Sequence, residues 1–305
     1  MTVSKQPLAV IDLGTNTFHL LIARPDDSGG FTEFFRERRF IKLAEDGIDR
    51  IGPGPWERGL TAMRAFSDQL AFHGVTEVRA IGTAALRTAG NGAEFIDTVK
   101  EETGIRIELI DGDEEARLIH QGASLAIPFT ERTRLLMDIG GGSVEFILAD
   151  ADRVHWSRSF PIGVAVLYRD YHTEDPLSDK QQTALRTFLA KALEPLEKAL
   201  QQHPVTELVG ASGTFDVLEQ YLDEPTAGQD YATISVGDFA AFRDKLIAMP
   251  IRDRLAMERM PPARAEMIPV ALVLLDVVIE LATIKQLLVS PFALKEGVLF
   301  EMLNA

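Results

Sequence analysis

The chain contains 305 residues, of which 46% are hydrophobic and 25% are charged, and its formal net charge is −15. The length favours two domains, the composition is ordinary for a globular protein, and the negative charge argues against general binding to DNA. Because the sequence has no cysteine, disulfide frameworks, cysteine-zinc sites and thiol catalysis are excluded.

Neither the N-terminal residues nor the most apolar segment has the pattern of an export or membrane sequence. Residues 1–7 lead too soon and too weakly into the first predicted strand to be a secretory signal. The most apolar run, 267–281, is interrupted by Asp276 and Glu280 and is shorter than a membrane span, so it predicts a buried helix. We therefore expect a cytoplasmic protein that does not bind a membrane.

The first predicted element is a hairpin with the features of a phosphate-binding turn. An apolar strand over 8–13 ends in Asp12, and the polar turn Gly14-Thr-Asn-Thr17 leads into a second apolar strand. Glycine lets the backbone approach a ligand, the N–H and hydroxyl groups can donate to phosphate oxygens, and the carboxylate can hold Mg²⁺ or its waters.

The rest of the first half alternates strands with helices, which predicts an α/β domain with helices packed on a mixed sheet. A linker is expected at 128–133. The predicted elements are a strand at 31–40, a helix at 55–73, a strand at 78–81 followed by two helices, a strand at 105–110, and a helix ending near 126.

The second half begins with another copy of the hairpin. A strand over 135–139 contains Asp138, the turn Gly140-Gly-Gly-Ser143 follows, and Glu145 lies on the return strand. Two copies predict two similar lobes that face each other across a cleft, each offering an acid and a polar turn. The later predicted elements are a strand at 153–160, a long helix at 178–202, a strand at 207–209, a strand at 286–290, and a helix at 293–303.

A third glycine-containing turn, Gly210-Ala-Ser-Gly-Thr214, follows the strand at 207–209 and opens a helix. It is either an anion cradle, since helix N-termini present unpaired N–H groups, or a simple strand-to-helix turn.

Three further charged residues have both a functional and a structural interpretation. Glu115, in the first turn of its helix, is either a capping acid or a catalytic acid. Glu145 faces either the turn or the solvent, and Arg87 either binds phosphate through its planar fork or forms a surface ion pair. The six histidines lack metal-ligand spacing and no Gly-x-Ser-x-Gly elbow occurs, which leaves Mg²⁺-assisted chemistry on phosphate.

At these residues the sequence resembles the exopolyphosphatase / guanosine pentaphosphate phosphohydrolase (Ppx/GppA) family. That resemblance implies two ribonuclease H-like α/β lobes of the actin, heat-shock ATPase and sugar-kinase superfamily, with a cleft between them. The matching segments, in family order, are 11–19, 83–87, 112–118, 138–145, 161–163, 210–214 and 294–297.

The resemblance also implies a role for each matching residue. Glu115 would be the general base that orients the attacking water, and Arg87 would bind the scissile phosphate. Asp138 would hold Mg²⁺, or Mn²⁺, with Asp12 and Glu145 assisting. The implied phosphate-binding residues are Gly14, Thr15, Asn16, Gly140, Gly141, Gly142, Ser143, Ser212, Gly213 and Thr214.

The resemblance further implies an N-terminal lobe over 1–127, on which a C-terminal helix at about 291–305 packs, and a C-terminal lobe over 128–305. Longer relatives continue into a helical domain of the HD type, which we do not expect in this chain. Two departures from the family pattern, Glu266 and Lys295, bear on substrate preference rather than on reaction type. A homodimer is expected because two-lobe relatives commonly form one.

The expected activity is release of terminal phosphate from polyphosphate or from guanosine pentaphosphate. A sugar or acid kinase of the same superfamily is the first alternative. It would require an adenosine pocket and usually an Asp as base. A non-catalytic sensor of polyphosphate or of an alarmone is the second alternative, and the retention of four acids, Asp12, Glu115, Asp138 and Glu145, argues against it.

Overall fold

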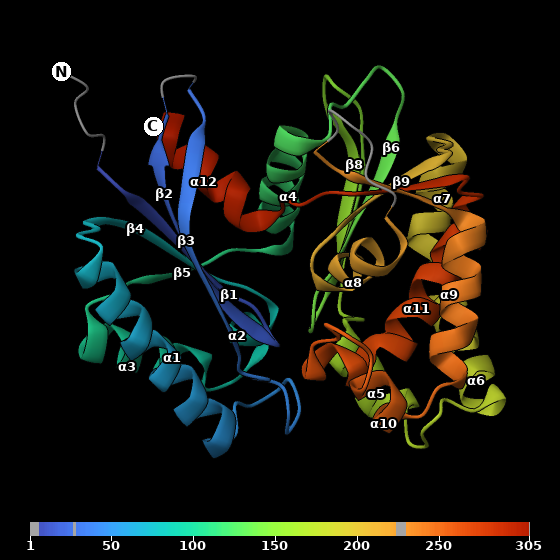
Figure 1. Cartoon of the computed structure of the whole chain (residues 1–305), viewed down its shortest axis with the longest axis horizontal. Helices are drawn as coiled ribbons and strands as arrows, with labels where there is room; N and C mark the ends of the chain where they lie inside the picture. Colours follow the sequence, from blue (N-terminus) through green and yellow to red (C-terminus); the bar gives the residue numbers. More distant parts are fainter. Residues whose placement is uncertain (1–5, 27–28, 224–229, 305) are drawn as a thin grey trace. The chain divides into compact units, whose positions relative to one another are not determined.

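The computed structural model describes residues 6–26, 29–223 and 230–304 (Figure 1). The chain divides into two compact units, which are described separately. Unit 1 comprises Met1–Gly122 with Leu294–Ala305, and unit 2 comprises Ala123–Ala293. Residues 1–5, the main part of the segment assessed for a secretory signal, lie outside the described residues.

Unit 1 is built on a five-stranded mixed sheet with the order β3-β2-β1-β4-β5. β1 is antiparallel to β2 and parallel to β4, and β4 is parallel to β5. The central strand is buried on both faces because helices cover both sides of the sheet. The strands are β1 Leu8–Leu13, β2 Thr17–Pro25, β3 Phe31–Phe40, β4 Glu77–Gly82 and β5 Ile107–Leu109.

Helices cover both faces of the unit 1 sheet. In Figure 1, α1 and α3 lie on one face and α4 and α12 on the other. A Cβ atom on Gly297 of α12 would lie 2.0 Å from the carbonyl oxygen of Leu118 in α4, so the close crossing of these helices requires glycine. The helices are α1 Pro53–Phe72, α2 Ala84–Thr88, α3 Gly92–Thr103, α4 Gly112–Ala126 and α12 Leu294–Asn304.

Unit 2 contains a six-stranded mixed sheet with the order β10-β11-β9-β6-β7-β8. Its strands are β6 Arg134–Ile139, β7 Val144–Ala149, β8 Val154–Phe160, β9 Glu207–Ala211, β10 Ala232–Ser235 and β11 Gln286–Val289. Its helices are α5 Val164–Tyr171, α6 Asp179–Ala192, α7 Glu194–Gln202, α8 Gly213–Leu222, α9 Val236–Ala248, α10 Ile251–Leu255 and α11 Pro262–Ala282.

The apolar segment 267–281 lies in α11, which packs against α5, α6, α8 and α9. Asp276, which interrupts this segment, is buried, and its carboxylate pairs with Arg186 and Arg243. Among the described residues, no helix has both the length and the apolar composition that crossing a membrane requires.

The structure corrects one prediction and adds elements that the sequence pattern did not reveal. The single helix expected over 178–202 is wrong, because α6 ends at Ala192 and α7 starts at Glu194. Pro195 lies in the first turn of α7 and has no N–H to continue the α6 hydrogen-bond ladder. Strand β10 and helices α9 and α10 were not predicted.

Candidate functional site

The first hairpin turn, Gly14–Thr17, is fixed by its own backbone and by the segment that follows β3. The Gly14 N–H donates to the Thr17 carbonyl at 3.0 Å, and a Cβ on Gly14 would lie 3.0 Å from that same oxygen. The carbonyls of Thr15 and Asn16 accept hydrogen bonds from N–H groups of residues 41–43, at 2.7 to 3.1 Å. These hydrogen bonds hold the turn in place and direct the carbonyls of Thr15 and Asn16 at residues 41–43.

Asp12 lies at the end of β1, beside this turn, and its carboxylate is partly buried. Burial raises the pKa of Asp12 from 3.8 to about 6, while the charge of Lys295 lowers it and the charge of Glu296 raises it. The Lys295 ammonium lies 3.8 Å from the carboxylate of the fully buried Glu296. Because the ionised carboxylate of Asp12 is poorly solvated, a bound cation would stabilise it.

Arg87 and Glu115 come together at the same edge of the unit 1 sheet as Asp12. Because β1, β4 and β5 are parallel, their C-terminal ends meet at one edge, and Arg87 and Glu115 follow β4 and β5. The Arg87 Nη1 group donates to the Ile110 carbonyl at 2.5 Å and to a Glu115 carboxylate oxygen at 3.3 Å.

The environment of Glu115 distinguishes between its two interpretations. The carboxylate of Asp111 accepts a hydrogen bond from the Glu114 N–H at 2.9 Å and so caps α4. The Glu115 side chain is only 8% exposed and contacts the 29% exposed Arg87. The helix end is thus capped by another acid, Asp111, and Glu115 lies against Arg87, the residue predicted to bind phosphate.

In unit 2, the turn Gly140–Ser143 is held by the N-terminus of α5. The carbonyls of residues 140–142 accept hydrogen bonds from the N–H groups of residues 163–165, at 2.9 to 3.2 Å. A Cβ on Gly163 would lie 2.4 Å from the Gly141 backbone, so only glycine allows this approach. Within the described part of the chain, the N–H groups of Gly141 and Gly142 donate no hydrogen bond. These two donors can bind an anion.

Asp138 and Glu145 are directly opposite each other in the β6–β7 pair, so their side chains share one face of the sheet. Both are buried, with exposures of 6% and 2%, and Glu145 accepts a hydrogen bond from the Ser159 hydroxyl at 2.7 Å. The solvent-facing interpretation of Glu145 is therefore wrong. Two neighbouring buried carboxylates repel each other, and a hard divalent cation would offset this repulsion and accept their oxygen atoms as ligands.

The third turn lies at the same sheet edge as the second. Ala211, at the end of β9, pairs with Asp138 of the parallel strand β6, and Ser212 follows it. Ser212 has φ 70° and ψ 178°, a conformation that costs a non-glycine residue about 1–3 kcal/mol and is typical of functional turns. The guanidinium of Arg264 lies against Gly213, where a Cβ would be 1.7 Å from its Nη2 atom.

The structure thus gathers the predicted residues within each unit. Asp12, the first turn, Arg87 and Glu115 belong to unit 1, and Asp138, Glu145 and the other two turns belong to unit 2. No group of three or more His, Asp or Glu side chains close enough to hold a metal ion occurs in the described ranges. Neither Ser159 nor Arg264 was assigned a role from the sequence. The strand pattern at 153–160 could have indicated Ser159, but only with the β7–β8 register known.

Comparison with known proteins connects these features to one family. The profile of the Ppx/GppA phosphatase family matches residues 21–305. A guanosine-5'-triphosphate,3'-diphosphate pyrophosphatase of Aeromonas salmonicida (strain A449) is 30% identical over 302 residues, which are 97% of this chain. The chain spans only 59% of the length of that relative.

Two solved structures have the same fold. The crystal structure of an exopolyphosphatase from Cytophaga hutchinsonii matches with a TM-score of 0.93 and 37% identity over 98% of both chains. The Ppx/GppA family member of Aquifex aeolicus matches with a TM-score of 0.80 and 25% identity, also over 98% of both chains. These likenesses confirm the predicted fold class, two α/β lobes of the actin-like ATPase type. The chain belongs to the Ppx/GppA phosphatase family.

Proposed function

We propose that this protein hydrolyses the terminal phosphoanhydride bond of inorganic polyphosphate or of guanosine pentaphosphate. Family membership and the match to an exopolyphosphatase structure support this proposal. The similarity to the guanosine-5'-triphosphate,3'-diphosphate pyrophosphatase of Aeromonas salmonicida supports the nucleotide as the second substrate.

The observation that carries the proposal is the contact between Arg87 and the buried Glu115. Glu115 is proposed to take a proton from the attacking water, whose oxygen bonds to the terminal phosphorus. The anhydride P–O bond breaks, and the shortened chain leaves with the bonding electrons. Arg87, whose planar guanidinium matches two phosphate oxygens, is proposed to offset the charge that develops on the transferred group. The turn N–H groups, including those of Gly141 and Gly142, would hold phosphate oxygens.

Each unit taken by itself contains carboxylates of the kind that Mg²⁺, or Mn²⁺ in its place, binds. The poorly solvated Asp12 and the opposed pair Asp138 and Glu145 are hard oxygen donors with excess negative charge. We propose that these three residues hold the cation, which would supply positive charge to the phosphate oxygens. Glu145 is held in place by Ser159, so its orientation does not depend on the ion.

The test is an incubation of pure protein and Mg²⁺ with polyphosphate, with guanosine pentaphosphate, and with ATP plus a panel of sugars. Phosphate release without an acceptor supports the proposal, and the rates on the first two substrates decide between them. Phosphate transfer that requires a sugar would instead identify a kinase, and binding without turnover would identify a sensor. The homodimer is part of the same proposal and is tested by light scattering coupled to size-exclusion chromatography.

A further inference from the structure

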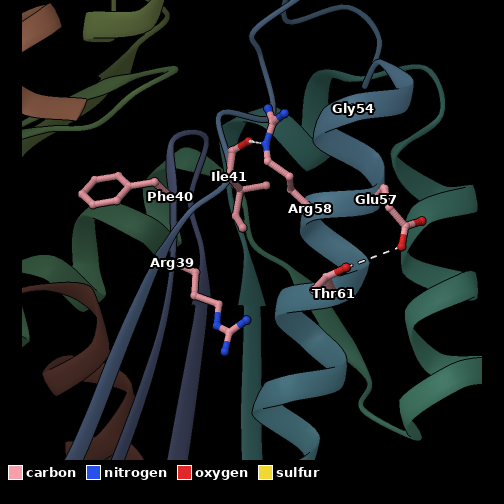
Figure 2. A pocket seen from close by; sticks show the side chains of 7 residues that line it. All are labelled: Arg39, Phe40, Ile41, Gly54, Glu57, Arg58 and Thr61. Atoms are coloured by element: carbon pink, nitrogen blue, oxygen red, sulfur yellow. Dashed lines mark hydrogen bonds between the residues drawn. The ribbon is translucent and has the colours of Figure 1, made fainter. Parts of the chain in front are cut away.

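A pocket of about 430 Å³ opens in unit 1, between the end of β3 and the first half of α1 (Figure 2). It is separate from the groups that carry the proposed chemistry, since neither Glu115 nor Arg87 lines it. Its walls contain two guanidinium groups, one carboxylate, one hydroxyl and one exposed aromatic ring. The lining residues are Arg39, Phe40, Ile41, Gly54, Glu57, Arg58 and Thr61.

The two arginines have donor groups that the protein itself does not use. Arg39 donates through Nε to Glu37 at 2.7 Å, its guanidinium carbon lies 5.9 Å from the centre of the Phe66 ring, and Figure 2 shows its side chain between β3 and α1. Its two terminal nitrogens donate to no group within the described ranges. Arg58 donates through Nε to the Ile41 carbonyl and through Nη2 to the Glu45 carboxylate, which leaves Nη1 beside Gly54. Donors of this kind, on a planar fork, match phosphate oxygens.

The carboxylates in and beside the pocket already accept hydrogen bonds from protein donors. Glu57 is the one acid among the lining residues, and it already accepts hydrogen bonds from Arg64 at 3.1 Å and from the Thr61 hydroxyl at 3.4 Å. Arg39 and Arg58 each pair with a carboxylate that does not line the pocket, Glu37 and Glu45, so the attraction for a polyanion comes from their unused N–H donors and not from net charge.

One residue connects this pocket to the first phosphate turn. The Ile41 N–H donates to the Asn16 carbonyl at 2.8 Å, and the Ile41 carbonyl accepts from Arg58 Nε at 2.9 Å. Ile41 therefore contacts both the turn and the pocket. Both lie at the end of the β1–β2–β3 sheet where Thr17 pairs with Phe40. A chain of several phosphates that is held at the turn therefore starts at the end of the sheet where this second cluster of donors lies.

We propose that this pocket binds the distal phosphate groups of a condensed-phosphate substrate, and so determines the preference for chain length. The inference rests on the proposed function. A substrate with only a few phosphates, such as tripolyphosphate, would occupy the turn without reaching Arg39. A longer chain would gain a charge-assisted hydrogen bond, which is worth about a tenfold gain in kcat/KM.

The experiment compares the ratio of kcat/KM for medium-length polyphosphate to that for tripolyphosphate in matched variants. Arg39→Gln removes the fork at a partly exposed position and should lower the ratio about tenfold. Arg39→Lys keeps the charge without the fork and should give an intermediate ratio. The control is Arg79→Gln, on β4 of the same unit, because Arg79 pairs with Glu108 and Glu301, neither of which lines the pocket. It should leave the ratio within about twofold of wild type. An unchanged ratio in Arg39→Gln would overturn the inference while the proposed hydrolase function stands.

A binding measurement separates the inference from the proposed function. If the wild type releases no phosphate, its affinity for medium-length polyphosphate is measured by calorimetry and decides whether the pocket binds the chain. An affinity that falls about tenfold in Arg39→Gln and not in Arg79→Gln supports the pocket, and equal affinities of wild type and Arg39→Gln refute it. Inorganic phosphate is titrated in the same way. If its affinity depends on Arg39 as that of polyphosphate does, and chain length does not change the affinity, the pocket holds a free phosphate ion and the substrate assignment is wrong.

Discussion

Replacing Asp12 by Asn is expected to stabilise unit 1 at alkaline pH when no divalent cation is present. Burial raises the pKa of Asp12 from 3.8 to about 6. Each pKa unit corresponds to about 1.4 kcal/mol, and the side chain is partly exposed to screening solvent, so the ionised carboxylate costs the folded state about 1–3 kcal/mol. Asn has a similar shape and carries no charge at any pH.

The sign of the effect depends on pH in a defined way. Because the folded pKa lies above the unfolded value, the contribution of Asp12 to stability is complete below pH 3.8 and is lost as the pH rises through about 6. The variant should therefore exceed the wild type in stability by the full amount at about pH 8, and should match it at or below about pH 4.

The two tryptophans allow this prediction to be measured in one unit. Trp56 belongs to unit 1 and Trp156 to unit 2, so a Trp156→Phe background makes fluorescence during urea unfolding report on unit 1. The experiment is performed in EDTA, with Asp97→Asn on the exposed surface of α3 as the control. A variant that is less stable than wild type at about pH 8, or an equal difference at both pH values, would refute the reasoning. Added Mg²⁺ should stabilise the wild type more than Asp12→Asn if Asp12 holds the ion.

Four further substitutions test other parts of the molecule. Glu115→Gln should lower turnover roughly 10²–10⁴-fold without changing the melting temperature, and Glu114→Gln, one residue away, should leave turnover close to wild type. Arg87→Lys should clearly lower turnover, because it keeps the charge and loses the planar fork; full activity would exclude a bidentate role. Asp138→Asn should raise the Mg²⁺ concentration for half-maximal activity about tenfold, as measured by metal titration. Arg254→Met should cost about 3 kcal/mol in urea unfolding, because Arg254 is fully buried and donates to two backbone carbonyls that would lose a partner.

The elements that could be predicted from the sequence are those whose pattern is local. The hairpins containing Asp12 and Asp138 combine short apolar strands with glycine-rich turns, and these signals lie within a few consecutive residues. Helix α1 has apolar residues at helical spacing. The break between α6 and α7 was missed because the helical periodicity continues past Leu193, and Pro195 was not recognised as the start of a second helix.

The contacts that could not be predicted depend on how distant segments align. Ser159 reaches Glu145 only because β8 pairs with β7 in one register, with an irregularity near Leu148. Arg264 is far in sequence from Gly213, and the close packing of its guanidinium on the third turn depends on how α11 lies beside α8. The sequence shows that such residues are charged or polar, but their partners follow only from the tertiary fold.

The two hairpins have the same close turn at the glycine, but different side chains lie opposite the acid at the end of the first strand. In both, the glycine after the first strand leaves no room for a side chain, since a Cβ would lie 3.0 Å or less from a carbonyl oxygen of the same turn. The strand-end acid, however, faces His19 in the first hairpin and Glu145 in the second. Directly opposed side chains share a face, so Glu145 places a second carboxylate opposite Asp138. The residue opposite Asp12 is a histidine, and the charges of Lys295 and Glu296 act on the pKa of Asp12 in opposite directions. The directly opposed pair of carboxylates therefore belongs to the second hairpin, whereas the residues that would act on water and phosphate, Glu115 and Arg87, belong to the same unit as the first.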